Sequence, residues 1–381
     1  MKIVFNTRHP DSPSAAFYRS AFSGLSQISF FDWDHYEDYD VALFMSFKPD
    51  IEDLISAKSR CPRIRIGIMD PRGGQIAGCF SHVDFVIADS LEVKDFFARY
   101  SLPTLLYTEY PVVQEQRKKH RPKEPVIIGY HGNRAHLAGM YPHITAALEK
   151  LAERYSLELW AMYNIENRGR CRIGLPANMP VKHIQWSMEN YTEQLSRADI
   201  GIVPNLMPIR NISKIKKKAV LWEGFFNDTQ DDYLTRYKVP SNPGRIIVFG
   251  CLGIPVVADF YPSALQVIQD ERNGLLACSS GGWFQALEKL IISAGLRQKL
   301  SEGMRDTVAR EFDYPVQNRR LAAFCEQILE QPPSRHFADL KLPENMDVGR
   351  DVRFGKKALF MRFDRVQKAL RRKAGKRMPF R

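Results

Sequence analysis

The loop that follows the first apolar run of the sequence carries side chains able to transfer protons. In RHPDSPSAAFYR, residues 8–19, either His9 or Asp11 could act as a general base. Arg8 and Arg19 in the same loop could bind an anionic ligand. The mixture of Pro, Ser and Asp before a helix also fits a plain helix N-cap. The segment therefore predicts either a catalytic loop or a capping loop.

A second candidate is His131, which follows a predicted strand and adjoins Gly132. It could contact a phosphate or sugar, or it could be a loop histidine bonded to backbone. The segment Asp32-Trp33-Asp34 has the D-x-D pattern of some metal sites, but we interpret its two aspartates as solvated surface residues. Since no His/Cys cluster has metal-ligand spacing, we expect no metal.

Elements that position these residues alternate in type along the first 110 residues. We predict strands over Lys2–Phe5, Val41–Met45, Ile64–Met69 and Phe85–Ala88. Helices are predicted over 15–25, 50–57 and 91–100. Buried strands alternating with helices indicate a parallel sheet covered on both faces. Residues 1–113 are thus predicted to form one doubly wound α/β domain.

The alternation restarts after residues 114–125, a charged segment with two prolines that we interpret as a linker. We predict strands over 126–130, 157–162, 183–186, 200–204, 255–258 and 274–277. We predict helices over 141–155, 191–197, 244–252, 264–270, 283–293 and 296–312. Residues 126–312 are therefore predicted to form a second Rossmann-like domain, interrupted by an insertion over 213–238. A C-terminal helix within 313–345 is expected to return to the first domain.

Four segments of the second domain resemble one enzyme family. They are IIGYHGNRAHL (127–137), RADIGIVPN (197–205), Gly253-Ile-Pro-Val-Val-Ala258 with Arg245 eight residues before it, and Asn273-Gly-Leu-Leu276. Together they resemble the donor domain of GT-B glycosyltransferases. The particular group is the retaining, family 4-like one that includes sucrose-phosphate synthases and bacterial polysaccharide glycosyltransferases. The resemblance is clear over about 125–330 and weaker over 1–112.

The resemblance implies a nucleotide-sugar site in a cleft between two Rossmann-like domains. Such enzymes stabilise the departing diphosphate with backbone N–H groups, helix N-termini and basic side chains. The positions that match this donor site are His131, Gly132, Asn133, Arg134, Pro204, Asn205, Ser241, Asn242 and Arg245. For Arg245 the alternative is a solvated arginine at a helix start. In this resemblance His9 or Asp11 would be the catalytic base, and the first domain would bind the acceptor.

One departure from the family pattern concerns the ribose of the donor. Many family members have a glutamate five residues before Gly253 and another eight residues earlier; here these positions are Val248 and Pro240. The ribose contact must therefore be made by another group. A non-catalytic GT-B protein that binds a glycan or a partner stays open as an alternative, as does a nucleotide-sugar epimerase.

The net charge of +12 is concentrated in the last residues. Residues 350–381 carry a net charge of +11, which leaves a nearly neutral body. Nucleic-acid enzymes spread basic residues over their folded domains, so we expect no nucleic acid as partner. Leu359, Phe363, Val366 and Leu370 recur at helical spacing within 355–373, so the basic tail 346–381 is predicted to contain an amphipathic helix for an anionic membrane surface. The alternatives are that this helix packs on the protein's own body, or that it stays disordered until a partner protein binds.

Cysteine spacing and hydropathy predict the cellular setting. Six cysteines without a CxxC pair indicate a reducing cytoplasm, and no run of 18 apolar residues occurs. We therefore expect a protein at the inner face of the membrane that needs no cofactor besides its nucleotide-sugar substrate. The expected function is sugar transfer to a glycan or lipid-linked acceptor in bacterial surface polysaccharide or lipopolysaccharide synthesis.

Overall fold

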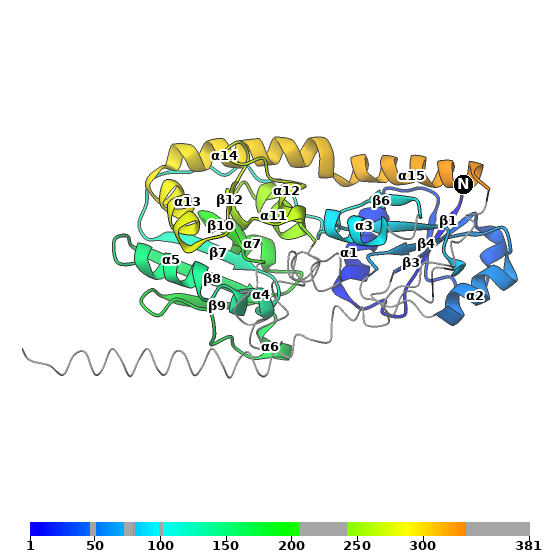
Figure 1. Cartoon of the computed structure of the whole chain (residues 1–381), viewed down its shortest axis with the longest axis horizontal. Helices are drawn as coiled ribbons and strands as arrows, with labels where there is room; N and C mark the ends of the chain where they lie inside the picture. Colours follow the sequence, from blue (N-terminus) through cyan, green and yellow to red (C-terminus); the bar gives the residue numbers. More distant parts are fainter. Residues whose placement is uncertain (46–50, 72–78, 80, 99–101, 206–241, 333–381) are drawn as a thin grey trace, which may run out of the picture.

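Two parallel sheets make up the molecule (Figure 1). The computed structural model describes residues 1–45, 51–71, 79, 81–98, 102–205 and 242–332. In this part of the chain each sheet has six strands and is flanked by helices, which confirms the predicted fold class of two doubly wound α/β domains. The predicted insertion, Ser241 and the basic tail lie outside the described residues.

The first sheet has the strand order β2-β1-β3-β4-β5-β6, with all pairings parallel. Its strands are β1 (Ile3–Asn6), β2 (Ile28–Phe30), β3 (Val41–Met45), β4 (Arg65–Met69), β5 (Phe85–Ala88) and β6 (Thr104–Leu106). Its helices are α1 (Pro13–Phe22), η1 (Tyr36–Asp38), α2 (Ile51–Arg60) and α3 (Leu91–Ala98). The strands β1, β3, β4 and β5 are buried throughout, as their unbroken apolar runs require of a sheet covered on both faces.

The second sheet has the order β12-β11-β10-β7-β8-β9, again wholly parallel. Its strands are β7 (Val126–His131), β8 (Leu157–Tyr163), β9 (Val181–Gln185), β10 (Ile200–Val203), β11 (Val256–Asp259) and β12 (Leu275–Ala277). Its helices are α4 (Arg134–Gly139), α5 (His143–Leu151), α6 (Ile165–Arg168), α7 (Tyr191–Ser196), α11 (Gly244–Cys251), α12 (Pro262–Leu265), α13 (Ser280–Ile292) and α14 (Ala294–Thr307). After a π-helical turn (Val308–Phe312), α15 (Tyr314–Glu330) closes the described chain.

Local residue chemistry explains where several of these elements begin and end. Gly253 has φ +66° and so provides a left-handed stop after α11. Ser279 caps α13 by accepting a hydrogen bond from the N–H of Gly282, so this helix begins at Ser280, three residues before the predicted start. In the same way Ser12 accepts from the N–H of Ala15 and caps α1.

The charged segment 114–125 lies against the second domain. The Lys118 ammonium donates to the carbonyl oxygens of Ser196 and Ala198, and the His120 ring lies 2.9 Å from the Gly253 carbonyl oxygen. Burial lowers the pKa of Lys118 to about 8. These contacts join the segment to the C-terminal end of α7 and to Gly253 at the end of α11. The segment between the domains therefore packs on the second domain.

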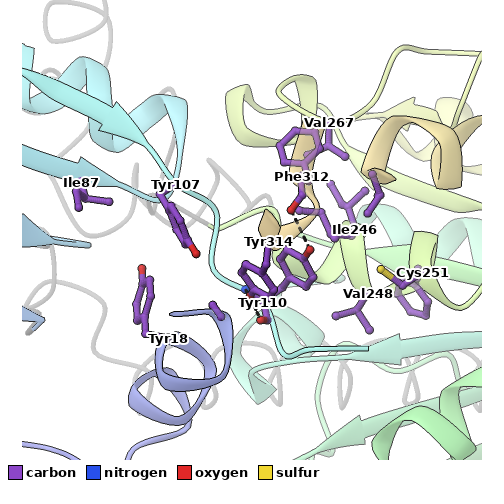
Figure 2. Packing of buried hydrophobic residues seen from close by; sticks show 14 of the residues in the cluster. Tyr18, Ile87, Tyr107, Tyr110, Ile246, Val248, Cys251, Val267, Phe312 and Tyr314 are labelled. Atoms are coloured by element: carbon purple, nitrogen blue, oxygen red, sulfur yellow. Dashed lines mark hydrogen bonds between the residues drawn. The ribbon is translucent and has the colours of Figure 1, made fainter. Parts of the chain in front are cut away.

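The chain passes between the domains a second time just before α15, and the two passages contact each other. The rings of Tyr110 and Tyr314 stack with centroids 4.4 Å apart and planes 9° apart (Figure 2). The Tyr110 N–H donates to the Tyr314 hydroxyl at 2.9 Å, and the Tyr110 hydroxyl donates to the Phe312 carbonyl oxygen. This pair of tyrosines therefore joins the two crossings between the domains.

Helix α15 belongs to the first domain although it follows the second in sequence (Figure 1). The Asn318 amide donates to the Ala21 carbonyl oxygen at the end of α1 and accepts from the Tyr107 hydroxyl at 2.8 Å. Gln317 accepts from the Thr108 N–H. The first domain is thus completed by residues from beyond the second.

Two general features concern cysteines and membranes. The six cysteines are all free thiols, and five of them are buried. Among the described helices, none combines the length and apolar character needed to cross a bilayer.

Candidate functional site

The candidate site lies where the strand order of the second sheet reverses direction. From β7 the chain builds outward to β8 and β9 on one side, then returns to place β10, β11 and β12 on the other. The strands β7 and β10 are neighbours, and the loops that follow them therefore leave toward opposite faces of the sheet. Open α/β sheets bind ligands in the crevice at such a switch point. The loops here are Gly132-Asn133 after β7 and Pro204-Asn205 after β10.

Gly132 makes a turn that only glycine adopts without strain. Its φ is +135°, and a Cβ added there would lie 2.8 Å from the Cδ atom of Arg245. The missing side chain therefore lets the Arg245 side chain pass directly over the backbone of the turn. This approach brings together two residues that lie far apart in sequence.

Arg245 bridges the two loops of the switch point from the first turn of α11. Its Nη1 atom donates to the Pro204 carbonyl oxygen at 3.2 Å, while its Nη2 atom is buried and has no hydrogen-bond partner among the described residues. The start of α11 is held by Asn242, whose Oδ1 atom accepts from the Gly244 N–H at 2.6 Å. The site thus presents one unpaired guanidinium N–H group beside a glycine turn and a helix N-terminus.

His131 is the buried last residue of β7 and faces α11. Its Nε2 atom lies 3.2 Å from the Arg245 carbonyl oxygen, and its ring packs edge-on against Phe249 with centroids 4.9 Å apart. Burial and the positive charge of Arg245 lower its pKa to about 3. The ring is therefore neutral at pH 7 and is hydrogen-bonded to backbone, as in the second of the two predicted interpretations.

This low pKa predicts a specific pH dependence of stability. Unfolded, the His131 ring takes up a proton near pH 6.5, whereas folded it stays neutral down to about pH 3. Since the unfolded state binds more protons below pH 6.5, stability falls as the pH falls. Between pH 7 and pH 5 the free energy of unfolding should drop by about 2 kcal/mol more in the wild type than in His131→Gln.

Chemical denaturation at a series of pH values measures this difference. His9→Gln is the control, because His9 is exposed and lies outside this site. If the free energy of unfolding depends on pH in the same way in the wild type and in His131→Gln, the His131 ring is not held neutral in the folded protein.

Asn205 occupies the first position after Pro204 and is 2% exposed. Its N–H donates to Oδ2 of Asp259 at 2.6 Å, and Oδ1 of Asp259 accepts from the indole N–H of Trp283 at 3.0 Å. Neither the oxygen nor the nitrogen of the Asn205 side-chain amide has a partner among the described residues. The backbone of this residue is therefore held firmly, while its side chain retains its full hydrogen-bonding capacity.

The other residues matched to the donor site lie around this centre. Arg134 is exposed at the start of α4 and donates to the Gly169 carbonyl oxygen at 3.2 Å. Asn133 is exposed, and its carbonyl oxygen accepts from the Tyr130 hydroxyl. Asn242 also donates to the Glu109 carbonyl oxygen at 2.7 Å, which joins this edge of the second domain to the first.

The loop with His9 and Asp11 lies at the corresponding reversal in the first sheet. Strand β1 lies between β2 and β3, so the loop after β1 leaves from the switch point of that sheet. His9 and Asp11 are both exposed, and Ser12 provides the N-cap that the capping-loop interpretation predicts. Arg8 is paired with Asp53 and stacks on Trp33, 4.4 Å from the ring centroid. Among the described residues, neither His9 nor Asp11 forms a hydrogen bond or ion pair with Arg245.

Three buried carboxyl groups follow other strands of the first sheet. Asp70 follows β4, Asp89 follows β5 and Glu109 lies three residues beyond β6. Burial, together with the charges of Glu109, Asp70 and Asp89, raises the pKa of Tyr18 well above its usual value. The sequence pattern did not point to Glu109, because the three-residue strand before it was not predicted.

Two sequence features outside the donor loops also have clear structural settings. Val248 is fully buried in the hydrophobic core, so the turn of α11 where family members carry a glutamate is apolar here; Pro240 lies outside the described residues. In the D-x-D segment, Asp32 accepts from the Tyr39 hydroxyl and Asp34 is paired with Arg60. The described residues contain no group of three acidic, His or Cys side chains arranged to hold a metal.

Comparison with solved structures identifies the architecture. A glycosyltransferase from Rickettsia africae aligns with TM-score 0.57 at 11% identity, over 87% of this chain and 98% of its own. HepE of Anabaena, solved in complex with UDP, aligns with TM-score 0.57 at 12% identity, over 86% and 100%. The apo form of WaaB, a lipopolysaccharide outer core galactosyltransferase, aligns with TM-score 0.52 at 12% identity, over 86% and 99%.

The chain therefore has the two-domain GT-B fold. No protein-family model matches the sequence, and no curated protein matches it either. At 11–12% identity the likeness concerns the fold alone.

Proposed function

We propose that the protein is a glycosyltransferase that takes a sugar from a nucleotide-sugar donor bound in its second domain. The observation that carries this proposal is the position of Arg245. Its guanidinium spans the switch point between the Gly132 turn and Pro204, with Nη2 left without a partner. A buried, unpaired guanidinium N–H beside a glycine turn and a helix start suits a diphosphate.

The reaction needs a group that stabilises the leaving diphosphate and a group that accepts a proton. As the bond between the anomeric carbon and the diphosphate oxygen breaks, negative charge grows on the diphosphate, where Arg245 and the α11 N-terminus stabilise it. The acceptor hydroxyl forms the new bond to the anomeric carbon and gives up its proton. His9 and Asp11 are the proposed bases, since their loop leaves the switch point of the facing domain. We propose retention at the anomeric carbon, with the acceptor hydroxyl attacking from the same face that the diphosphate leaves, and no metal requirement.

A glycan or lipid-linked acceptor in surface polysaccharide synthesis fits the predicted basic tail, which would hold the enzyme at an anionic membrane from the cytoplasmic side. HepE binds UDP and glucose in one of its structures, and WaaB is a lipopolysaccharide galactosyltransferase. These two proteins guide the choice of substrates to test first.

A screen of UDP-, GDP-, ADP- and CMP-sugars by thermal denaturation tests the proposal. One nucleotide class should raise the melting temperature, because a ligand at about 100 times its Kd stabilises the native state by about 2.7 kcal/mol. Adding a chelator should leave the shift unchanged. Turnover of the donor without any acceptor would instead point to an epimerase.

A non-catalytic GT-B protein is the second candidate, and the buried Val248 favours it because the usual ribose-binding carboxylate is missing from α11. If no nucleotide sugar or nucleoside diphosphate alters the melting temperature, the transferase proposal fails and this candidate replaces it.

A further inference from the structure

The side chain of Asn205 has an unusual position for a buried amide. An unpaired buried polar group costs about 1–3 kcal/mol, so buried amides are almost always hydrogen-bonded. The similarly buried Asn273 donates to Val267 and Thr307, and Asn318 bonds to Ala21 and Tyr107. Among the described residues, Asn205 is the buried amide whose nitrogen and oxygen both stay unpaired.

The unpaired amide does not result from a loosely held segment. The Asn205 N–H is bound by Asp259, and Asp259 is held in turn by the fully buried Trp283. A residue whose backbone is supported by a second layer of hydrogen bonds, and whose side-chain amide is left with free polar atoms, is typical of a pre-organised binding position. The chain thus carries an acceptor and a donor on a firmly held loop residue.

The location of this amide limits the ligand group that it could bind. Arg245 donates to the carbonyl oxygen of Pro204, the residue directly before Asn205. A ligand whose diphosphate contacts Arg245 would therefore lie beside the loop that carries Asn205. On α11 the neighbouring turn carries the apolar Val248, so no carboxylate from that helix could bind the hydroxyl groups of a sugar unit there.

We propose that Asn205 binds a vicinal diol next to the diphosphate and so replaces the missing carboxylate. One hydroxyl donates to Oδ1 and its neighbour accepts from Nδ2, which uses both atoms of the amide. This assignment rests on the proposed nucleotide-sugar site. The diol belongs either to the ribose of the nucleotide or to the transferred sugar, and the two sources can be separated by experiment.

Calorimetric titration of the full chain provides the test, with Asn205→Ala and the similarly shaped Asn205→Leu. The ligands are pyrophosphate, the nucleoside diphosphate that binds the wild type, its 2′-deoxy counterpart and the nucleotide sugar. Both variants should bind pyrophosphate normally. If the ribose is the ligand, their affinity for the nucleoside diphosphate should fall about 10- to 100-fold, whereas the loss should be smaller for the 2′-deoxy ligand, which keeps only one of the two hydroxyls. If the transferred sugar is the ligand, the loss should appear with the nucleotide sugar only.

Two results would overturn the assignment while leaving the proposed function intact. One is unchanged affinity of both variants for every ligand. The other is an equal loss for pyrophosphate and all nucleotides, which would mean that Asn205 only shapes the loop. Absence of nucleotide binding by the wild type would refute the assignment and the proposed function together. Asn205→Leu guards against a folding artefact, since removing unpaired polar atoms without changing volume should preserve the apo melting temperature.

Discussion

Arg245→Ala should lose most of the thermal stabilisation that a nucleotide sugar gives the wild type, while the melting temperature of the apo protein stays nearly the same. A hydrogen bond to a charged group contributes about 1.5–3 kcal/mol, so the Kd should rise about 10- to 150-fold. At a ligand concentration that is about 100 times the wild-type Kd, the stabilisation would then fall from about 2.7 kcal/mol to below about 1.5 kcal/mol. The rate of transfer should fall about 10²- to 10³-fold if the guanidinium also stabilises the leaving diphosphate.

A charge-matched control separates this effect from general electrostatics. Arg197 is exposed on the same domain and is paired with Glu193 across one helical turn, so Arg197→Ala should leave ligand binding unchanged. Arg245→Lys should fall between wild type and alanine, because lysine keeps the charge but not the planar set of donors. An Arg245→Ala protein that is stabilised as strongly as the wild type would exclude this guanidinium as a phosphate contact.

Gly132→Ala should reduce both stability and donor binding. A Cβ at this position would lie 2.8 Å from Cδ of Arg245, and φ +135° is strained for any residue with a side chain. We expect a loss of about 1–3 kcal/mol in folding free energy from the backbone. The displaced Arg245 should weaken nucleotide binding to about the level of Arg245→Ala.

The matched control is Gly281→Ala, within α13, where an added Cβ has nothing within 4 Å. That change should stabilise slightly, by about 0.5–1 kcal/mol, because alanine favours the helix. Melting curves with and without ligand measure both variants. Normal ligand binding by Gly132→Ala would place the donor away from this turn.

The sequence pattern predicted the two domains because their central strands are unbroken apolar runs. The strands β2 and β6 escaped prediction, since Ile28–Phe30 and Thr104–Leu106 have three residues each and are half-buried at the sheet edges. Helix α12 is shorter than predicted and ends at Leu265. Short edge elements depend on their neighbours more than on their own periodicity.

The candidate site was predictable only in part. Gly132 and Arg245 could be found from motifs, but their contact across 113 residues follows from the strand order, which no local pattern contains. The support of Asn205 by Asp259 and Trp283 likewise joins three distant segments. Residues that work as a set through tertiary contacts cannot be recognised as a set from spacing alone.

The return of α15 to the first domain has a practical consequence for protein engineering. Because Asn318 holds α1 and Tyr107, the first domain is encoded by two separate stretches of the gene. A chimaera that exchanges first domains between proteins of this fold therefore needs two crossover points, one on each side of the Tyr110–Tyr314 stack. A single junction at the segment 114–125 would pair each new domain with a foreign closing helix.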